Sequence, residues 1–369
     1  MKIYYWLQNN SRRGERINMN QYDVIIIGGG QAGLSLGYYL KKTALSFIIL
    51  DKGSEVGEVW RKRYDSLTLF TPNFYSALPG SEFNGTKNLY PTKDEVADYL
   101  QAYAEENELP IQHQTDVQEL HQVTDGFRVV TNRGDFHTKK VVVATGPFQK
   151  PLIPGFSQSL SSDVLQLHSS EYKNPEQLQK GSVLVIGGGN SGAQIAVELS
   201  RERDVYFSVG HKLKFIPLDV GGKSVFWYID KLGLYSAGKD SFIGSKIRKL
   251  KDPILGSELK PLLDSKAIKL KPRTISIQDD TFQFQDDTEL KVSNVIWSTG
   301  FRADYQWIHI SNLFDQTGFP IHERGVTPVT GFYFIGLPWL HSRSSALLGG
   351  VGKDAEYLVN QIMKPAAKE

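Results

Sequence analysis

The chain has 369 residues, a formal net charge of +2 at pH 7 and no cysteine. This length predicts two or three domains, and the nearly balanced charge excludes a general electrostatic case for nucleic acid or an anionic membrane as partner. Without cysteine there is no disulfide, no thiolate metal site and no thiol relay, so any redox chemistry depends on a bound cofactor.

The sequence carries no recognisable membrane or secretion signal. No run of about 18 apolar residues occurs, and the N-terminus lacks the apolar segment of a signal peptide. Residues 1–18 are polar and irregular and include Arg12, Arg13 and Arg16. Their poor amphipathic periodicity favours an idle tail over a mitochondrial-like address, so we assign 1–21 to a non-functional tail. We expect a cytoplasmic protein that binds neither membranes nor nucleic acid.

The first informative stretch is an apolar run, Asp23–Ile27, which ends in glycines and passes into an amphipathic segment. It predicts a strand, a tight turn and a helix. Such a turn leaves unpaired N–H groups at the helix N-terminus, where a pyrophosphate can bind. Gly28 permits the turn, Gly30 lets the backbone approach the phosphates, and Gly33 lets the helix pack on the strand.

An acidic residue completes this motif. A second apolar run, Ser46–Leu50, ends in Asp51, which lies 51 − 28 = 23 positions after the first glycine. An acid at this distance is expected to accept a hydrogen bond from a ribose hydroxyl. The combination predicts a dinucleotide-binding unit, with a ligand-free glycine turn as the alternative.

The following segment predicts a loop, a helix and several strands. Trp60 lies in a glycine-containing loop and either covers a flat ligand or fills a core. A capping-box pattern predicts a helix over Thr92–Ala104. Alternating segments around Ile111, Val117–Leu120 and Phe127–Val130 predict a β-meander.

A buried strand and a domain crossing come next. Lys139–Gly146 reads as a strand whose Thr145-Gly146 end approaches a cofactor, and the prolines from Pro147 to Pro154 predict the crossing. The opening motif then recurs, because the apolar run Val183–Ile186 leads into Gly187, Gly189 and Gly192. Two copies are far less probable by accident than one.

The two copies differ where the acid is expected. The same spacing gives 187 + 23 = 210, which is Gly210, followed by His211 and Lys212. A cationic residue at this place suits a 2′-phosphate, whereas an acid suits a free ribose hydroxyl. We therefore predict FAD at the first turn and NADPH at the second. NADH stays open, because histidine is largely neutral at pH 7 unless its pKa is raised.

The remaining sequence returns to the first unit. Residues 213–273 are rich in lysine and aromatic residues and are interpreted as a solvated helical insertion rather than a membrane or nucleic-acid surface, and this insertion could cover the active site as a lid. Val295–Gly300 repeats the strand that ends in Thr-Gly. A last strand over Gly331–Gly336 precedes a helix that opens at Gly349, whose N-terminus is expected to face the flavin.

We thus predict an α/β protein with two Rossmann-like dinucleotide-binding domains. An FAD-binding domain spans 22–150 and 300–369, and an NAD(P)H-binding domain, 151–299, is inserted into it.

Several motifs together resemble the class B flavin-dependent monooxygenases, and most closely the small YUCCA- and CzcO-like members. Besides the two glycine turns they are the Trp60–Leu67 segment with Thr71-Pro72, the Gly336–His341 segment and the Leu347–Asp354 segment. The resemblance spans 22–358, nearly the whole chain.

The resemblance implies a reaction with two cofactors. Such proteins bind FAD tightly and NADPH reversibly, and the reduced flavin forms a C4a-peroxyflavin with O2 that passes one oxygen atom to nitrogen or sulfur, or attacks a carbonyl. The partners are then a small-molecule substrate and O2, with a homodimer possible. An NAD(P)H oxidase and a nucleotide-sensing regulatory flavoprotein are the alternatives. A disulfide reductase is excluded because cysteine is absent.

The resemblance also implies site residues. Asn190 and Ser191 would lie near the nicotinamide and flavin, Asn73 is the nearest match to an active-site asparagine, and Arg343 with His341 could bind a substrate carboxylate. His168 survives from the linker motif of the family and is interpreted as structural. The FAD set is Gly28, Gly30, Gln31, Ala32, Gly33, Asp51, Lys52, Val59, Trp60, Leu67, Thr71, Val117, Ala144, Thr145 and Gly146. The NAD(P)H set is Gly187, Gly189, Asn190, Ser191, Gly192, His211, Lys212, Ser298, Thr299 and Gly300.

Overall fold

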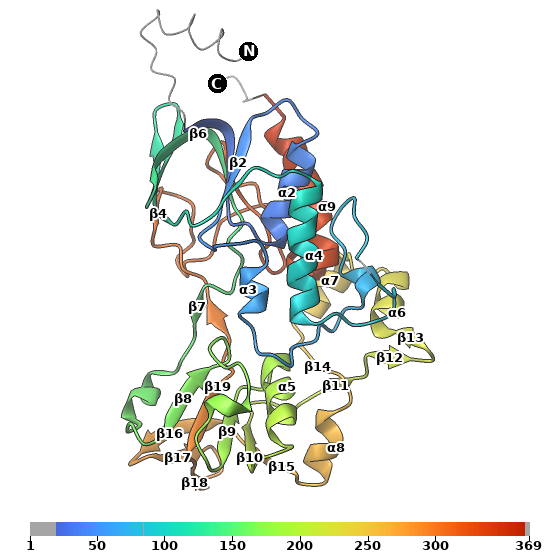
Figure 1. The fold of residues 1–369 in the computed structure, drawn as a ribbon, viewed down its shortest axis with the longest axis vertical. Helices are drawn as coiled ribbons and strands as arrows, with labels where there is room; N and C mark the ends of the chain where they lie inside the picture. Colours follow the sequence, from blue (N-terminus) through green and yellow to red (C-terminus); the bar gives the residue numbers. More distant parts are fainter. Residues whose placement is uncertain (1–19, 84, 366–369) are drawn as a thin grey trace, which may run out of the picture.

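The computed structural model describes residues 20–83 and 85–365, so nearly all of the predicted N-terminal tail lies outside the described residues. Two sheets with parallel cores occupy opposite ends of the long axis of the molecule (Figure 1). The predicted α/β class with two Rossmann-like units is confirmed.

The first sheet has the strand order β21-β4-β5-β6-β1-β2-β3, with β22 also paired to β6. Its parallel core is β3-β2-β1-β6-β22. The core strands are short apolar runs, as expected where helices or loops cover both faces of a sheet. The strands are β1 (Gln21–Ile27), β2 (Phe47–Leu50), β3 (Ile111–Gln112), β4 (Val117–Val123), β5 (Gly126–Thr131), β6 (Gly134–Val143), β21 (Ile308–His309) and β22 (Phe332–Phe334).

Strand β6 joins a meander to the parallel core. Its first half pairs antiparallel with β5, and its second half pairs parallel with β1 and β22. The predicted meander is therefore present as β4-β5-β6, but the inclusion of Ile111 was wrong, because β3 pairs with β2 at the far edge of the sheet. Alternation along one strand identifies the strand without identifying its neighbour.

Three long helices, α2 (Gln31–Leu40), α4 (Lys93–Glu106) and α9 (Leu348–Ile362), lie side by side on one face of the first sheet (Figure 1). The alternation of β1 explains the two cores: Val24 and Ile26 pack beneath the helices, while Ile25 and Ile27 pack on the other face. The predicted capping box starts α4, because the Thr92 side chain accepts a hydrogen bond from the Glu95 amide. The helices and 3-10 turns are α2 (Gln31–Leu40), α3 (Glu58–Arg61), η2 (Asn73–Tyr75), α4 (Lys93–Glu106), η5 (Arg343–Ala346) and α9 (Leu348–Ile362).

The second sheet repeats the arrangement of the first. Its order is β15-β10-β9-β19-β8, all parallel, and a three-stranded meander lies between β15 and β19 in the chain as β4 and β5 lie between β3 and β6. The elements are η3 (Gly155–Ser159), β8 (Leu165–His168), η4 (Pro175–Gln177), β9 (Val183–Ile186), α5 (Asn190–Leu199), β10 (Val205–Ser208), β15 (Ile268–Lys271), β16 (Thr274–Gln278), β17 (Thr281–Phe284), β18 (Glu289–Lys291) and β19 (Asn294–Trp297).

The chain passes between the two sheets twice, and the two passages pair with each other. β7 (Lys150–Pro151) lies antiparallel to β20 (Phe301–Arg302) in the narrow region of the molecule (Figure 1). These positions agree with the predicted crossings, while the domain boundaries themselves stay a prediction.

A long segment, residues 209–267, leaves the second sheet after β10 and returns at β15. We call this segment the excursion. The predicted extent of 213–273 was too long, because Ile268–Lys271 is a sheet strand that pairs with β10. None of the helices in the described part of the chain is long and apolar enough to cross a membrane. The excursion contains β11 (Phe215–Ile216), β12 (Asp219–Val220), β13 (Lys223–Ser224), α6 (Val225–Lys231), α7 (Phe242–Arg248), β14 (Ile254–Leu255) and α8 (Leu259–Asp264).

Candidate functional site: two glycine turns

The first glycine turn is built so tightly that two of its glycines are required by the fold. Gly28 has φ of +113°, and a Cβ added there would lie 2.7 Å from the Ala144 carbonyl oxygen. A Cβ at Gly33 would lie 2.0 Å from the Gly28 oxygen. A Cβ at Gly30, in contrast, meets nothing within 4 Å. Gly30 therefore faces an open cradle, where a ligand can approach the backbone.

The helices that follow both turns begin without a side-chain cap. Neither α2 nor α5 has a side-chain hydrogen bond at its N-cap glycine, Gly30 or Gly189, and neither has an acidic residue in its first turn. The first N–H groups of a helix carry partial positive charge and need an acceptor. Both helix ends therefore fit a phosphate group.

Asp51 closes the first turn. Its carboxylate accepts hydrogen bonds from the amides of Gly29, at 2.5 Å, and of Gly53, at 2.7 Å. The Thr115 amide donates to the Asp51 carbonyl at 2.8 Å, which brings the segment before Val117 to the same edge. These contacts hold the acid at the carboxyl end of β2, beside the turn.

The second turn copies the first almost atom for atom. Gly187 has φ of +122°, and its added Cβ would lie 2.2 Å from the Ser298 oxygen; the Cβ of Gly192 would lie 2.3 Å from the Gly187 oxygen. Gly189 again faces open space. Where the first turn has Ala144, the second has Ser298, whose buried hydroxyl has no hydrogen-bond partner among the described residues.

The predicted equivalence of Asp51 with Gly210 was wrong by one residue. The Gly28 amide donates to Leu50, and the Gly187 amide donates to Ser208, so the residue after each strand is Asp51 in one copy and Val209 in the other. The reason is the connection from helix to strand, which spans 41–46 in the first copy and only 200–204 in the second. A count from the glycines cannot detect a shortened turn.

Arg273, which sequence reasoning missed, lies at the second turn. Its Nε is 2.6 Å from the position of a Cβ on Gly210, so the guanidinium covers the backbone just before His211. His211 lies beside Gly188, and burial together with Lys251 and Arg273 lowers the pKa of its imidazole. Arg273 follows β15, a strand that only the tertiary pairing with β10 brings here, so no local motif identifies it.

The Trp60–Leu67 segment belongs to the first unit but reaches into the second. Tyr64 is buried in the core of the second unit. Its hydroxyl donates to Gln194 of α5 at 2.6 Å, and the Gln194 amide donates back to the Thr68 carbonyl at 3.1 Å. Burial raises the pKa of Tyr64, so the phenol stays protonated. Trp60 itself is partly buried and packs against the first core.

Arg63 is a half-buried cation at the junction of the two units. Its guanidinium lies over the rings of Phe148, at 5.7 Å, and Phe301, at 5.4 Å. Burial lowers its pKa. Within the described ranges it forms no ion pair, which is unusual for a mostly buried charge.

Asn190 and Ser191 differ in their surroundings. Both polar atoms of the Asn190 side chain contact the excursion: Oδ1 accepts from the Leu255 amide at 2.8 Å, and Nδ2 donates to the Pro253 carbonyl at 3.2 Å. Ser191 is exposed at the first turn of α5. Burial raises the pKa of Tyr64, and hydrogen bonding with the Ser191 hydroxyl lowers it by a smaller amount.

Thr71 and Asn73 are buried in the long loop that connects α3 to α4. The Thr71 hydroxyl lies 2.8 Å from that of Ser76, and the Asn73 amide donates to the Thr86 carbonyl at 3.0 Å. Asn73 directly precedes Phe74 and Tyr75, the latter of which packs against the excursion. The structure thus brings Asn73 close to the place where the two units meet.

Arg343 pairs with a carboxylate of the excursion. Its Nη2 lies 2.8 Å from Oδ1 of Asp252, and both side chains are partly or largely exposed. The neighbouring His341 accepts a hydrogen bond at its carbonyl from the Lys239 amide at 2.6 Å. Both residues therefore connect η5 to the excursion, and the predicted carboxylate site at Arg343 stays a prediction.

His168 is fully buried at the carboxyl end of β8 in the second unit. Its Nε2 lies 2.9 Å from the Gly300 carbonyl and its Nδ1 lies 2.8 Å from the Ser170 hydroxyl. Burial lowers the pKa of this imidazole. These contacts agree with the structural role predicted for it.

The remaining predicted residues differ in their contacts and burial. Gln31 donates to the Ala346 carbonyl at 3.3 Å, which ties α2 to η5. Ala144 and Ser298 donate their amides to the ends of β1 and β9, at Ile27 and Ile186. Exposed or half-buried positions are Lys52, Val59, Leu67, Val117, Thr145, Gly146, Lys212, Thr299 and Gly300, whereas Ala32 is buried.

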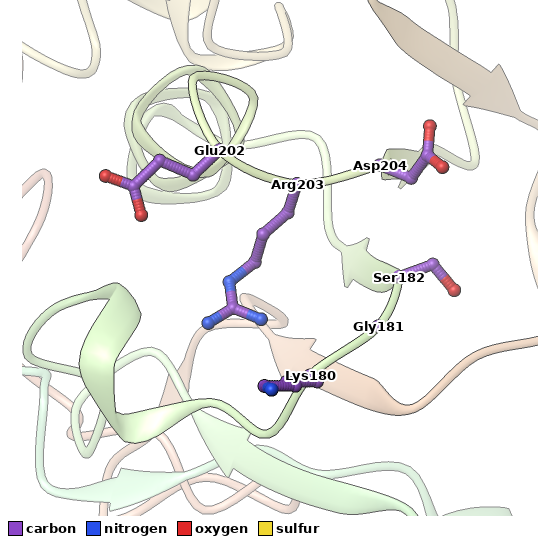
Figure 2. A pocket seen from close by; sticks show the side chains of 6 residues that line it. All are labelled: Lys180, Gly181, Ser182, Glu202, Arg203 and Asp204. Carbon is purple, nitrogen blue, oxygen red and sulfur yellow. The ribbon is translucent and has the colours of Figure 1, made fainter.

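A separate hollow of about 430 Å³ lies outside this region (Figure 2). Ser182 and Asp204, which line it, precede β9 and β10, so it lies at the amino ends of the strands. Its central Arg203 already donates to the carbonyls of Gln179 and Pro175. Ligands of open α/β sheets bind at the carboxyl ends, where the glycine turns are.

Comparisons with known proteins agree with this geometry. Residues 25–213 match the family model described as pyridine nucleotide-disulphide oxidoreductase. A CzcO-like oxidoreductase of Geobacillus kaustophilus, itself uncharacterized, is 57% identical over 92% of this chain and 98% of its own. The probable indole-3-pyruvate monooxygenase YUCCA3 of Arabidopsis thaliana is 27% identical over 85% of this chain and 81% of its own.

Among solved structures, the flavin-containing monooxygenase from Stenotrophomonas maltophilia superposes with a TM-score of 0.78 and 29% identity, over 93% of this chain and 98% of that one. The family predicted from the sequence motifs is confirmed. The chain is an oxidoreductase of the pyridine nucleotide-disulphide oxidoreductase family, and within it belongs to the CzcO-like members of the class B flavin-dependent monooxygenases.

Proposed function

We propose that this flavin monooxygenase uses FAD and NADPH to transfer one oxygen atom of O2 to a small organic substrate, at a nitrogen or sulfur atom or a carbonyl carbon. The observation that carries the proposal is the glycine turn that occurs twice with opposite chemistry, an acid at one copy and cations at the other. The named relatives that act as monooxygenases support it.

The first turn would hold FAD. The open cradle at Gly30, the uncapped N-terminus of α2 and the carboxylate of Asp51 fit a pyrophosphate and a ribose. When bound, FAD supplies hydride acceptance and the activation of O2, chemistry that no side chain of this cysteine-free protein provides. The N-terminus of α9, which packs against α2 and follows η5, would favour negative charge nearby.

The second turn would hold NADPH. Gly189 offers the same open cradle, and the Ser298 hydroxyl is a free polar group for a bound ligand. Arg273 and Lys212 would contact the 2′-phosphate as charged groups, whereas His211 would do so as a neutral donor because of its lowered pKa.

The reaction site would lie where the two units meet. The excursion places an aromatic cluster there, in which Tyr75 of the first unit packs against Phe226 and Tyr235. Such a cluster would exclude water from the reaction site and so prevent side reactions there. The proposed domains are those of the sequence prediction, 22–150 with 300–369 and 151–299.

The test is the balance of electrons in the purified, FAD-loaded protein. One NADPH and one O2 should be consumed for each oxygenated product and each water, with a panel of organic sulfides, amines, ketones and 2-oxo acids offered. Equal amounts of NADPH and H2O2 with every substrate would instead identify an NAD(P)H oxidase. Nucleotide binding without turnover would identify a sensor.

A further inference from the structure

The face of β4 and β21 that is turned away from the core of the first unit carries a group of metal-ligating side chains. Glu119 and His121 lie on β4, two residues apart, and His309 lies on β21. Side chains at positions i and i+2 of a strand share a face. Because β21 pairs parallel with β4 and His309 is the register partner of His121, all three side chains stand on one face.

Their ligand atoms are already gathered. Oε2 of Glu119 lies 2.7 Å from Nε2 of His121, and the two imidazole rings stack with centroids 5.0 Å apart. One ligand atom from each residue lies within 4.8 Å of the others. Ligands of a tetrahedral zinc ion lie about 3.3 Å apart, given bonds of about 2.0–2.1 Å. The required adjustment, which includes a lengthening of the distance between Glu119 Oε2 and His121 Nε2, is within reach of side-chain torsions, since all three side chains are at least partly exposed.

The surroundings leave the site accessible and fix its backbone. The neighbours on the opposite face, Leu120 and Ile308, are buried and hold the strands in register. The next cation on the same face is Arg128, which faces His121 from β5 and is neutralised by an ion pair with Asp135. The ligand atoms therefore have no unpaired positive charge beside them in the described part of this face.

We propose that Glu119, His121 and His309 form a binding site for a divalent transition-metal ion of the zinc type. Two imidazoles and one carboxylate are a donor set that suits Zn²⁺, whereas Mg²⁺ and Ca²⁺ prefer oxygen ligands alone. Three protein ligands leave a fourth position for water. The site is independent of the proposed oxygen transfer, since none of the three residues belongs to either glycine turn.

The bound metal ion would hold β21 against β4. β21 is a two-residue strand on the segment that returns from the second unit, and its neighbour Trp307 accepts a hydrogen bond at its carbonyl from the Leu120 amide at 2.8 Å. A metal bond between His121 and His309 would tie this returning segment to the meander. A ligand that binds only the folded state raises stability by mass action.

The experiment uses the full-length, FAD-loaded protein without a histidine tag, after treatment with a chelator. Titration with ZnCl2 in a calorimeter should show one site per FAD, and CoCl2 should give the visible absorption of a low-coordinate Co²⁺ ion. Zn²⁺ should also raise the Tm. His121→Ala and His309→Ala should each weaken Zn²⁺ binding at least about tenfold, because each removes one of three ligands, and should abolish the rise in Tm.

The matched control is His137→Ala. His137 lies on the same face, two strands away from His121 beyond Arg128. This variant should bind Zn²⁺ like the wild type, and all variants should keep their FAD absorbance and NADPH oxidation, which establishes that they are folded. Absence of one-to-one binding in the wild type, or binding that survives both His121→Ala and His309→Ala, would overturn the proposal.

Discussion

The two glycine turns share a backbone and differ in the side chains around it. Both use a glycine at positive φ, a close helix and an uncapped helix end. Around this common frame Asp51 is replaced by Val209, and Ala144 by Ser298. Phosphate recognition thus belongs to the backbone, which is the same in both copies, whereas discrimination between nucleotides depends on the few side chains that differ.

A second comparison concerns the connection from β2 to β3 in the first unit and from β10 to β15 in the second. In the first unit it spans 51–110, and Tyr64 from it is buried in the core of the second unit. In the second unit it spans 209–267, and Phe226 and Tyr235 from it pack on Tyr75 of the first unit. Each unit therefore sends the same connection onto the other, which holds the two turns in a defined relation.

The largest expected effect comes from substitutions that disrupt the backbone geometry shared by the two glycine turns. Gly33→Ala places a methyl group 2.0 Å from a carbonyl oxygen, so α2 must move off β1 at a cost of about 1–3 kcal/mol or more. We expect a lowered Tm and loss of FAD. Gly192→Ala should leave FAD bound and abolish reduction by NADPH. Gly30→Ala, whose Cβ meets no protein atom within 4 Å, is the control for the fold and should keep the wild-type Tm when both proteins are compared without FAD. A Gly33→Ala protein with normal FAD content would contradict the comparison.

The next effect removes the acid of the first turn. Asp51→Ala leaves the amides of Gly29 and Gly53 without their acceptor, and each hydrogen bond to a charged group contributes about 1.5–3 kcal/mol. FAD should dissociate at least about tenfold more readily, as measured by equilibrium dialysis. Asp125→Ala, in an exposed turn, should have no effect. Equal FAD affinity in both variants would remove Asp51 from the cofactor site.

Arg273→Ala tests the cations of the second turn. Losing a charged contact to the 2′-phosphate should lower kcat/KM for NADPH about tenfold and leave the value for NADH unchanged. Lys271→Ala, at the end of β15 and two residues before Arg273, is the matched control, since its ammonium group donates to Thr288. If kcat/KM falls equally for NADPH and NADH, Arg273 stabilises the fold and does not recognise the 2′-phosphate.

We expect His168 to make the second unit sensitive to acid. By strand register it stands where the first unit has Phe334. Its folded pKa is lowered by burial, so the unfolded chain takes up the proton more readily. Stability is therefore intact above the unfolded pKa of about 6.5 and falls as the pH drops below it. His168→Gln should reduce the fall in Tm between pH 7 and 5, whereas His137→Gln should follow the wild type.

The smallest effect concerns the contact between η5 and the excursion. The exposed pair of Arg343 and Asp252 should contribute less than about 1 kcal/mol, so either alanine variant should keep the Tm. Only Arg343→Ala should raise KM for a 2-oxo acid, with neutral sulfides unaffected. An unchanged KM would assign Arg343 to docking alone.

The sequence by itself determined the repeated strand, turn and helix, because apolar runs and glycine spacing are local and the physics of the turn is contained within a few residues. It also predicted the capping box at Thr92 and the family, and it predicted the strands β6 and β19, although these end at Val143 and Trp297 and not at the Thr-Gly pairs. Of the predicted site residues, Asp51 and His211 lie beside the glycine turns, Asn73 lies in the loop before α4, and Arg343 contacts the excursion.

Only the tertiary structure decided which residues face the second turn. Strand pairing brings Arg273 to Gly210, and the shortened connection before β10 puts Val209 where the count from the glycines expected Gly210. The exchange of Tyr64 and Tyr235 between the units, and the alignment of His121 with His309, likewise join residues far apart in the chain. Such pairings depend on register between distant segments, which local periodicity does not encode.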